Sequence, residues 1–450
     1  MASETEAGAE FIRSWLDTSH LNSVPGAIVS IDVAGESIFN QSYGFADISS
    51  GEAMTTSHQF QIASQSKLFT AAAVLQLQEK GLLNIKDSAA ISLPELKHAD
   101  DPRSANITVE QLLTHTSGLS RDGAHANFWE LASPFPNDKE LMDQLVNERL
   151  VFSPSLQMKY SNLGYAALGS IIERVSDSSY EDYITHNIIE PLGLNETSVG
   201  RPLDASRIPT AYSRQIQGKR SALPLNATDA FTPATGIYST TRNLLRFYSE
   251  LNPNTITPTI LSSDSLKEMR IPRVTALHSG GIEYGLGVDI GSDAGVNIVG
   301  HGGGFPGHRS GTIVDAKYDI SVSAFTNSID SDAFSIAIDT ARVMRYFLEN
   351  GPVSDTNQKR FNTTLESIWR QRQIIAVGNK VLSVDPSETN PFSDTSIEIL
   401  NPLADDKLVI TQSNSFDSPG EQVLFPKHAP GTVVYAGRTL KKIPPTDTDS

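Results

Sequence analysis

Cysteine is missing from the chain, which has 450 residues. Its absence excludes disulfide bonds, zinc sites built from thiolates, cysteine nucleophiles and lipid anchors attached through cysteine. Serine-based chemistry is compatible with this composition.

Basic residues are few compared with acidic ones: 35 Lys and Arg stand against 52 Asp and Glu, which gives a formal net charge of −17. A charge of this sign argues against nucleic acid or an anionic membrane surface as the main partner. Long apolar runs are also missing, because no stretch reaches about 18 apolar residues. We therefore expect no membrane insertion.

The segment Met1–Glu10 is polar and acidic. It lacks the basic start and apolar core that mark a secretory signal. We therefore expect a cytoplasmic protein for the sequence as written, with export left open if the natural N-terminus is longer.

The chain is longer than one typical domain, and 39% hydrophobic and 19% charged residues suit a folded protein. Ala27–Val33 and Glu36–Gln41 read as two strands joined by Ala34-Gly35, which predicts a hairpin of an antiparallel sheet. A mainly helical segment follows over about 80–202. Strand-like runs resume near Tyr284, and the glycine-rich stretch His301–His308 lies between two of them.

We therefore predict an α+β fold: an antiparallel sheet covered by helices, with an inserted mainly helical subdomain. The polar segment Glu349–Lys359 reads as a linker, and the short strand-like runs after it predict a small all-β module. The expected domains are a catalytic domain over 1–350 and a β-rich domain over 351–450.

Ser64 and Lys67 are three positions apart at the start of the helix-forming run Leu68–Lys80. This spacing places both side chains on one face of a helical turn. A helix N-terminus favours negative charge developing on a serine oxygen. The four-residue pattern also occurs on ordinary exposed helices, so its value depends on the rest of the chain.

Two further polar clusters stand at element boundaries, where side chains can reach a cleft: Tyr160 with Asn162, and His301-Gly302-Gly303. The sequence has no G-x-S-x-G elbow and no H-E-x-x-H motif, which counts against an α/β-hydrolase and a zincin. His115, at a predicted helix end, is interpreted first as a structural histidine and second as a base or ligand.

In this order, the three clusters resemble the motifs of the serine β-lactamase and D-Ala-D-Ala carboxypeptidase superfamily. The similarity is to its class C β-lactamase-like branch, which includes D-aminopeptidases and family VIII-type esterases. It extends from about Val24 to Leu348. Supporting stretches also match: His115–Leu119, Pro191–Gly193, Gly236–Arg246 and Tyr284–Gly287.

The resemblance implies a serine nucleophile, Ser64, that forms an acyl-enzyme, with no cofactor and no metal. Tyr160 is the expected general base, on the argument that a Lys67 ammonium lowers its pKa; neutral Lys67 as the base stays open. Asn162 is expected to bind Lys67 and the substrate. By family alignment, the backbone N–H groups of Ser64 and Gly304 form the oxyanion hole.

His301 and Gly303 belong to the third motif and are expected to bind substrate. His301 replaces the lysine found in many relatives and is largely neutral near pH 7, which weakens the case for a true β-lactamase. Arg309 is a candidate for binding a substrate carboxylate. The sequence fits equally well with Arg309 as an ordinary surface arginine. Specificity is expected from the loops at Gly123–Asn147 and the segment His301–Arg309, with a contribution from the C-terminal module left open.

The first expectation for function is a hydrolase of amide or peptide bonds in D-amino-acid compounds, like a D-aminopeptidase or D,D-carboxypeptidase. A carboxylesterase, a lactonase or an acyltransferase with the same site is the alternative. A non-catalytic binding protein that keeps the fold is an alternative from a different class. The expected partners are a small molecule or short peptide, with a homo-oligomer possible and no nucleic acid.

Overall fold

The computed structural model describes the chain apart from residues 1, 276–280, 294, 354, 415–416 and 444–450. Two compact units are formed: Met1–Ser23 with Asp339–Ser450, and Val24–Ile338. The expected domain boundary near residue 350 stays a prediction, although the first helix groups with the C-terminal segment. None of the helices in the described ranges is long and apolar enough to cross a membrane.

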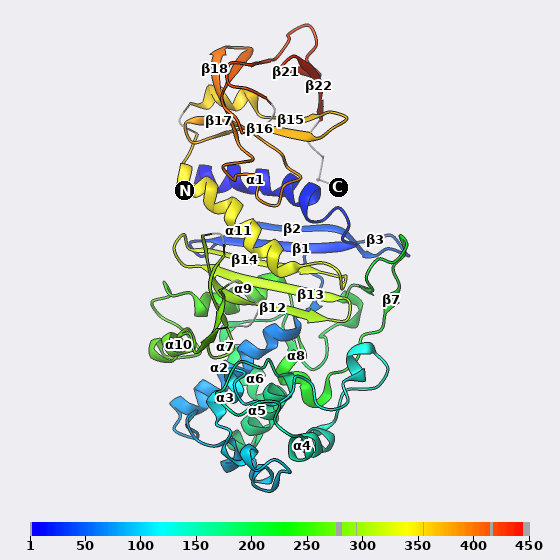
Figure 1. The fold of residues 1–450 in the computed structure, drawn as a ribbon, viewed down its shortest axis with the longest axis vertical. Helices are drawn as coiled ribbons and strands as arrows, with labels where there is room; N and C mark the ends of the chain where they lie inside the picture. The colour runs from blue at the N-terminus through cyan, green and yellow to red at the C-terminus, as the bar shows by residue number, and fades with distance from the viewer. Residues whose placement is uncertain (1, 276–280, 294, 354, 415–416, 444–450) are drawn as a thin grey trace. The chain divides into compact units, whose positions relative to one another are not determined.

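Nine strands of the described chain form the antiparallel sheet of the Val24–Ile338 unit, in the order β3-β2-β1-β14-β13-β12-β11-β10-β9 (Figure 1). The strands from the two ends of this unit meet at the β1–β14 pair, where Val29 lies opposite Ala324. Their bounds are Gly26–Val33 (β1), Glu36–Asp47 (β2), Glu52–Ala53 (β3), Val274–Thr275 (β9), Glu283–Tyr284 (β10), Asp289–Asp293 (β11), Val296–Phe305 (β12), His308–Asp315 (β13) and Ile320–Thr326 (β14).

The predicted hairpin is confirmed. Ala34 and Gly35 join β1 to β2 with φ values of 51° and 79°, both in the left-handed region that tight hairpin turns require. The glycine-rich stretch around His301 is different from the expectation, because residues up to Phe305 continue β12 instead of forming a loop. Bulky residues are rare there since neighbouring chain segments approach the strand backbone closely.

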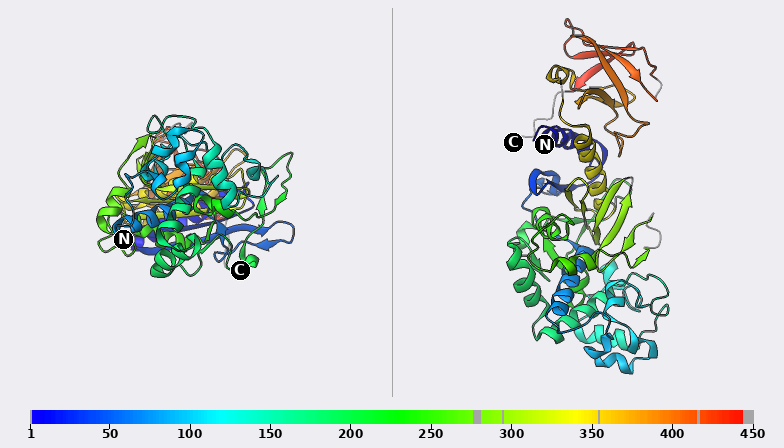
Figure 2. Two further views of the ribbon diagram at one scale, coloured as in Figure 1. Left: turned by 90° about the horizontal axis from the view of Figure 1, so that it is seen from below. Right: turned by 90° about the vertical axis from the view of Figure 1, so that its left-hand side faces the viewer.

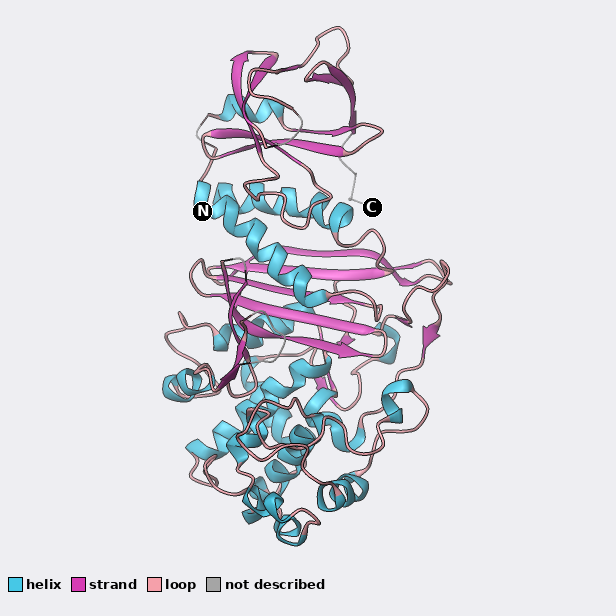
Figure 3. Ribbon diagram, viewed as in Figure 1, coloured by secondary structure: helices cyan, strands magenta, loops and turns pink. Residues whose placement is uncertain are grey.

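The helices of this unit lie in the chain between β3 and β9 and gather beside the sheet (Figure 3). They begin before and end after the predicted range of about 80–202. The α+β prediction is thereby confirmed. The helices that matter below are α2 (Ser66–Glu79), α3 (Val109–Leu113), α4 (Asp138–Asn147), α5 (Asn162–Ser176), α8 (Thr232–Thr235) and α9 (Thr241–Leu251).

Helix α2 is buried on nearly every side, with all residues from Ser66 to Leu77 in the interior. A helix that is apolar all round belongs in a core rather than at a surface. Phe69 stacks on Phe247 of α9 with ring centroids 3.9 Å apart. The predicted capping box before α3 is also present, since Thr108 and Gln111 satisfy each other's backbone N–H groups.

The other unit contains a closed barrel of eight strands within the described residues (Figure 2). The barrel closes where β15 pairs with β22. This confirms the predicted all-β segment. The bounds are Thr363–Glu366 (β15), Gln371–Val377 (β16), Lys380–Val384 (β17), Glu398–Ala404 (β18), Lys407–Gln412 (β19), Gln422–Leu424 (β20), Thr432–Tyr435 (β21) and Arg438–Ile443 (β22).

Helix α1 (Ala2–Ser19) and the part of helix α11 (Ala333–Asn350) that begins at Asp339 belong to the same unit as the barrel. Trp15 of α1 donates an indole hydrogen bond to the Glu388 carbonyl at 2.9 Å. Phe11 and Phe347 both contact Phe392, with ring centroids 4.9 and 5.5 Å away. These contacts give the unit a small apolar cluster outside the barrel.

Candidate active site

Ser64 lies in the short 3-10 segment Ala63–Gln65, directly before α2. Its predicted place at a helix start is confirmed. The preceding residue, Ala63, has a φ of 52°, which is unusual for a residue with a side chain. Backbone strain of this kind persists only where the surrounding structure fixes it. The Ile62 carbonyl is fixed, since Ser310 donates to it at 2.7 Å.

Lys67 is fully buried one turn into α2. Its Nζ lies 3.3 Å from Ser64 Oγ, 2.7 Å from Asn162 Oδ1 and 2.8 Å from the Ala234 carbonyl of α8. Burial holds the pKa of the Lys67 amine well below its usual range; the Asp122 charge opposes this shift and the Arg121 charge adds to it. The site therefore favours the neutral amine far more than an exposed lysine does.

Tyr160 stands two residues before the start of α5, where Ser161 is the N-cap and accepts from the Gly164 N–H at 2.9 Å. Its ring centroid is 4.9 Å from Lys67 Nζ. Burial raises the pKa of the Tyr160 phenol, and its hydrogen bond with Ser64 opposes that shift. The expected lowering of this pKa by Lys67 is therefore wrong, because desolvation dominates.

Asn162 links Lys67 to a charged pair. Its Oδ1 accepts from Lys67 and its Nδ2 donates to Asp122 Oδ1 at 2.7 Å. Asp122 also pairs with Arg121 at 3.1 Å. These contacts fix which way the Asn162 amide faces, with its oxygen toward the amine of Lys67.

His115 is fully buried and has a φ of 59°. Its Nδ1 accepts a hydrogen bond from the Ser161 N–H at 3.1 Å, which leaves the proton on Nε2. Burial, together with the charges of Lys67 and His301, holds the His115 pKa well below its usual range. The interpretation as a structural histidine fits these contacts, although it binds a backbone N–H and not a helix-end carbonyl.

Strand β12 lies against the segment before Ser64. A Cβ on Gly303 would come within 2.2 Å of the Ile62 carbonyl oxygen and 2.3 Å of Ser310 Oγ. Only a residue without a side chain fits this approach. Gly303 and its neighbour Gly304 therefore bring bare backbone close to the serine segment.

His301 has one ring nitrogen, Nε2, 3.1 Å from the Tyr284 hydroxyl, and the other, Nδ1, 2.5 Å from the Gly302 carbonyl. Burial and the Lys67 charge lower the pKa of His301 to about 3. Its ring centroid is 6.5 Å from that of Tyr160. His301 thus joins the predicted cluster as a neutral imidazole.

Arg309 lies in β13, the strand next to β12. Its Nε donates to the Ser331 carbonyl at 3.1 Å, and it lies opposite Gly304 in the β12–β13 pair. Its role in binding a carboxylate stays a prediction.

The loop region over Gly123–Asn147 brings a group of aromatic rings to the end of β12. Phe135 stacks with Phe305 at a centroid distance of 6.0 Å, and Trp129 meets Phe305 edge-on at 5.8 Å. Phe128 packs behind them, 4.5 Å from Phe135. This segment therefore supplies an apolar wall next to the glycines of β12.

Sequence reasoning missed three contributors. Asp122 follows the His115 stretch in a short Asp-Gly turn, which alone is no sign of a role. Tyr284 was noted only as part of a matching stretch, and its hydroxyl faces His301. Asp289, at the start of β11, has a pKa raised to about 7 by burial, and its charge raises the pKa values of Tyr160 and Tyr284.

The fold and this geometry define a serine hydrolase in which a lysine and a tyrosine lie next to the serine hydroxyl. The Beta-lactamase family model matches residues 17–344, and the chain belongs to this family. The predicted superfamily is confirmed.

Among curated proteins, the chain is similar to penicillin-binding protein 4* of Bacillus subtilis (strain 168), with 32% identity over 292 residues, 61% of this chain and 62% of that protein. It is also 29% identical over 234 residues to protein flp of Staphylococcus aureus (strain NCTC 8325 / PS 47), covering 51% of this chain and 46% of that protein. The matched part thus spans only about half to three fifths of these relatives.

Solved structures share the fold. An octameric penicillin-binding protein homologue from Pyrococcus abyssi has a TM-score of 0.65 at 20% identity, covering 96% of this chain and 98% of that one. D-amino acid amidase from Ochrobactrum anthropi SV3, solved with D-phenylalanine, has a TM-score of 0.64 at 24% identity, and the match covers 76% of this chain and 99% of that one. EstCE1, a hydrolase with promiscuous acyltransferase activity, has a TM-score of 0.62 at 19% identity, and the match covers 76% of this chain and 99% of that one.

Proposed function

We propose that the chain hydrolyses amide or peptide bonds of D-amino-acid compounds through an acyl-enzyme on Ser64. The observation that carries this proposal is the fully buried Lys67 amine, 3.3 Å from the Ser64 hydroxyl oxygen. A serine hydroxyl is a weak nucleophile until a base within hydrogen-bond reach takes its proton.

Neutral Lys67 is the base in this proposal, ahead of the Tyr160 phenolate. A neutral amine has two N–H donors and one lone pair. The contacts with Asn162 Oδ1 and the Ala234 carbonyl, at 2.7 and 2.8 Å, use both donors, so the lone pair is left for the Ser64 hydroxyl. Burial supports this protonation state, and a buried lysine is a common general base.

In the acylation step, Ser64 Oγ bonds to the substrate carbonyl carbon as its proton passes to Lys67. The carbonyl oxygen becomes an oxyanion, for which the backbone N–H groups of Ser64 and Gly304 are the proposed donors. When the C–N bond breaks, the leaving amine takes the proton back. Water then attacks the carbonyl carbon of the ester and gives a proton to Lys67. The C–O bond to Ser64 breaks, the serine oxygen takes that proton, and the acyl group leaves as a carboxylic acid.

Tyr160 acts as a neutral phenol in this scheme. Its pKa is raised by burial, and it is hydrogen-bonded to Ser64, so it keeps its proton until the leaving group needs one. We propose that Tyr160 passes the proton between Lys67 and the leaving amine. This role needs the ring to be held in place but does not need a phenolate.

Neutral substrates suit the third motif. A neutral imidazole at His301, with a pKa of about 3, gives no permanent cation for a substrate carboxylate. This supports amides and short peptides over substrates that need a recognised carboxylate beside the scissile bond. The D-preference rests on the amidases among the structures of similar fold.

The test compares the turnover of D-phenylalanine amide and L-phenylalanine amide by the wild-type chain and by Ser64→Ala. We expect turnover of the D-amide, a value of kcat/KM at least tenfold lower for the L-amide, and none with Ser64→Ala. Equal turnover of both enantiomers would contradict the D-preference. Activity retained by Ser64→Ala would contradict the acyl-enzyme.

A carboxylesterase is the second candidate, favoured by the same neutral His301 and by the apolar wall at Phe305. It uses the same nucleophile and base, and only the leaving group differs. An alcohol leaves more readily than an amine, so ester turnover with no amide turnover would favour it over the amidase.

A further inference from the structure

The barrel unit contains a cavity of about 770 Å³ at the end of strands β15, β16, β21 and β22. It is lined entirely by residues of this unit. Its volume lies in the range of small-molecule sites.

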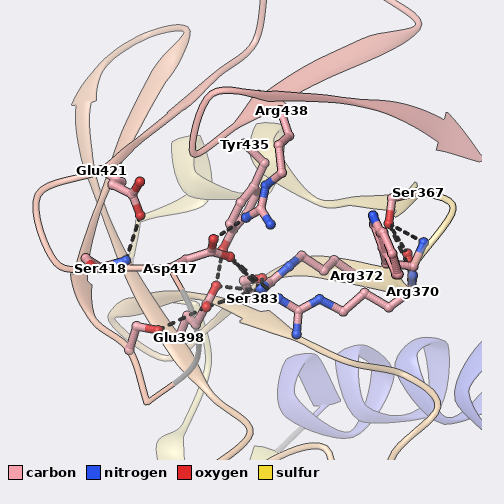
Figure 4. Close-up of polar contacts among 12 residues, drawn as sticks. Ser367, Arg370, Arg372, Ser383, Glu398, Asp417, Ser418, Glu421, Tyr435 and Arg438 are labelled. Atoms are coloured by element: carbon pink, nitrogen blue, oxygen red, sulfur yellow. Dashed lines mark hydrogen bonds and ion pairs between the residues drawn. The ribbon is translucent and has the colours of Figure 1, made fainter.

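Two residues that line the cavity, Arg372 and Tyr435, belong to a buried charged cluster (Figure 4). The Arg372 guanidinium, only 5% exposed, donates to Glu398 Oε2 at 2.5 Å and to Asp417 Oδ2 at 2.7 Å. Tyr435 donates its hydroxyl hydrogen bond to Glu398. These contacts fix Arg372 and Tyr435, which both line the cavity.

Cations exceed anions in this cluster. Asp417 also pairs with Arg438 and lies 3.6 Å from Arg370. Three arginines therefore face two carboxylates, those of Glu398 and Asp417, within a chain whose net charge is −17. Arg370 and Arg438 line the cavity nearer its opening, with 33% and 53% of their side chains exposed.

Apolar side chains border the same opening. Ile368 and Trp369 are 93% and 84% exposed, and both line the cavity. Their turn is held by Ser367, whose Oγ accepts from the N–H groups of Trp369 and Arg370 at 3.2 and 3.1 Å. Single exposed apolar residues are ordinary, but here two large ones are adjacent, fixed and next to excess positive charge.

We propose that this cavity binds a small organic anion, a carboxylate that carries an apolar chain. The carboxylate is recognised by Arg370 and Arg438, since a guanidinium fork matches a carboxylate bidentately. The apolar chain covers Trp369 and Ile368 and removes them from water. The site is independent of Ser64 and its chemistry.

The probe is decanoate below its micelle concentration, with decanol as the uncharged analogue, read by tryptophan fluorescence and calorimetry on the full chain. We expect saturable binding of one decanoate with a blue shift of Trp369 emission, and binding of decanol at least tenfold weaker. Trp369→Phe should remove the shift and keep the heat of binding. Equal binding of both probes, or no saturable binding, would overturn the proposal.

Arg370→Gln and Arg370→Lys test the charged contact. The Gln variant should bind decanoate at least fivefold more weakly, and the Lys variant should lie between it and the wild type. Arg360→Gln is the matched control, because Arg360 is an equally exposed arginine of the same unit that pairs with Asp405 at 3.2 Å outside the cavity. Unchanged binding in Arg370→Gln would contradict the proposed site.

A membrane surface is the competing occupant, because the Ile368-Trp369 turn beside arginines resembles an interfacial anchor. Vesicles with and without phosphatidylglycerol separate the two. A Trp369 shift with anionic vesicles and none with free decanoate would overturn the proposal in favour of membrane binding. A shift with decanoate and none with vesicles supports the cavity.

Discussion

The imidazole of His115 lies against the phenol ring of Tyr160, with ring centroids 4.2 Å apart. Two hydrogen bonds join the same histidine to the residues on either side of that tyrosine. Its Nδ1 accepts from the Ser161 N–H at 3.1 Å, and its backbone carbonyl accepts from the Lys159 N–H at 2.7 Å. The fully buried His115 therefore holds Tyr160 in place through its ring and through both neighbouring residues.

Replacing His115 by Phe keeps a ring against Tyr160 and removes the acceptor for the Ser161 N–H. We expect kcat to fall roughly tenfold or more, because small displacements of reacting groups are costly. The unpaired N–H should lower the free energy of unfolding by about 1–3 kcal/mol. Steady-state kinetics and urea unfolding measure the two effects.

His58→Phe is the matched control for that variant. His58 is also buried and also accepts from a backbone N–H, that of Thr55, at 3.0 Å. The His58→Phe variant should lose free energy of unfolding to a similar extent as His115→Phe and should keep the wild-type kcat. A kcat that falls equally in both variants would mean that His115 matters only for folding.

The pH profile of kcat/KM separates the two candidate bases. Burial lowers the pKa of Lys67 and raises that of Tyr160. If neutral Lys67 is the base, kcat/KM rises with pH as Lys67 loses its proton; this rise is the acid limb of the profile. The value of kcat/KM then stays level until Tyr160 ionises, above pH 10. A profile that is still rising at pH 10 would favour a Tyr160 phenolate.

Asp289 also titrates near neutral pH, since its pKa is about 7, and it could produce an acid limb of its own. Asp289→Asn removes that group and should leave the limb assigned to Lys67 in place. Disappearance of the limb in this variant would reassign it to Asp289.

Two charges next to the site shift the Lys67 pKa in opposite directions. Asp122 raises it and Arg121 lowers it. Asp122→Asn keeps an acceptor for the Asn162 amide but removes the charge, so the acid limb should move to lower pH. Arg121→Gln should move it to higher pH. Shifts in one direction for both variants would contradict an electrostatic origin.

Gly303→Ala should disrupt the serine segment. The added Cβ would lie 2.2 Å from the Ile62 carbonyl oxygen, part of a backbone that cannot move without displacing Ser64. We expect kcat/KM to fall about a hundredfold or more and stability to fall by about 1–3 kcal/mol.

Gly302→Ala is the control for Gly303→Ala, since the atom nearest to its Cβ would be Cβ of Phe334, at 3.3 Å. Its effect on kcat/KM should be small, because this contact needs a shift of only a few tenths of an ångström and does not involve the Ile62 carbonyl. Equal losses in kcat/KM for both glycine variants would show that β12 tolerates no side chain, whatever its distance from Ser64.

Local sequence signals predicted the elements that depend on neighbouring residues. The capping box of Thr108 and Gln111 and the Ala34-Gly35 turn are both set within a few residues, and both are present. The order of the three motifs likewise indicated the family.

Features that depend on distant segments could not be predicted in this way. Burial lowers the pKa of Lys67, and its amine contacts Asn162 and the Ala234 carbonyl, which are far away in the sequence. The glycines before Phe305 looked like a loop because the reason for them, the approach of Ile62 and Phe334, appears only in the fold. Asp122 was missed for the same reason.

The most direct test of the account is intact-protein mass spectrometry after treatment with a fluorophosphonate, followed by peptide mapping. The account predicts a single adduct on Ser64, slowed strongly in Lys67→Met and absent in Ser64→Ala. An adduct on another serine, or labelling of Lys67→Met at the wild-type rate, would contradict it.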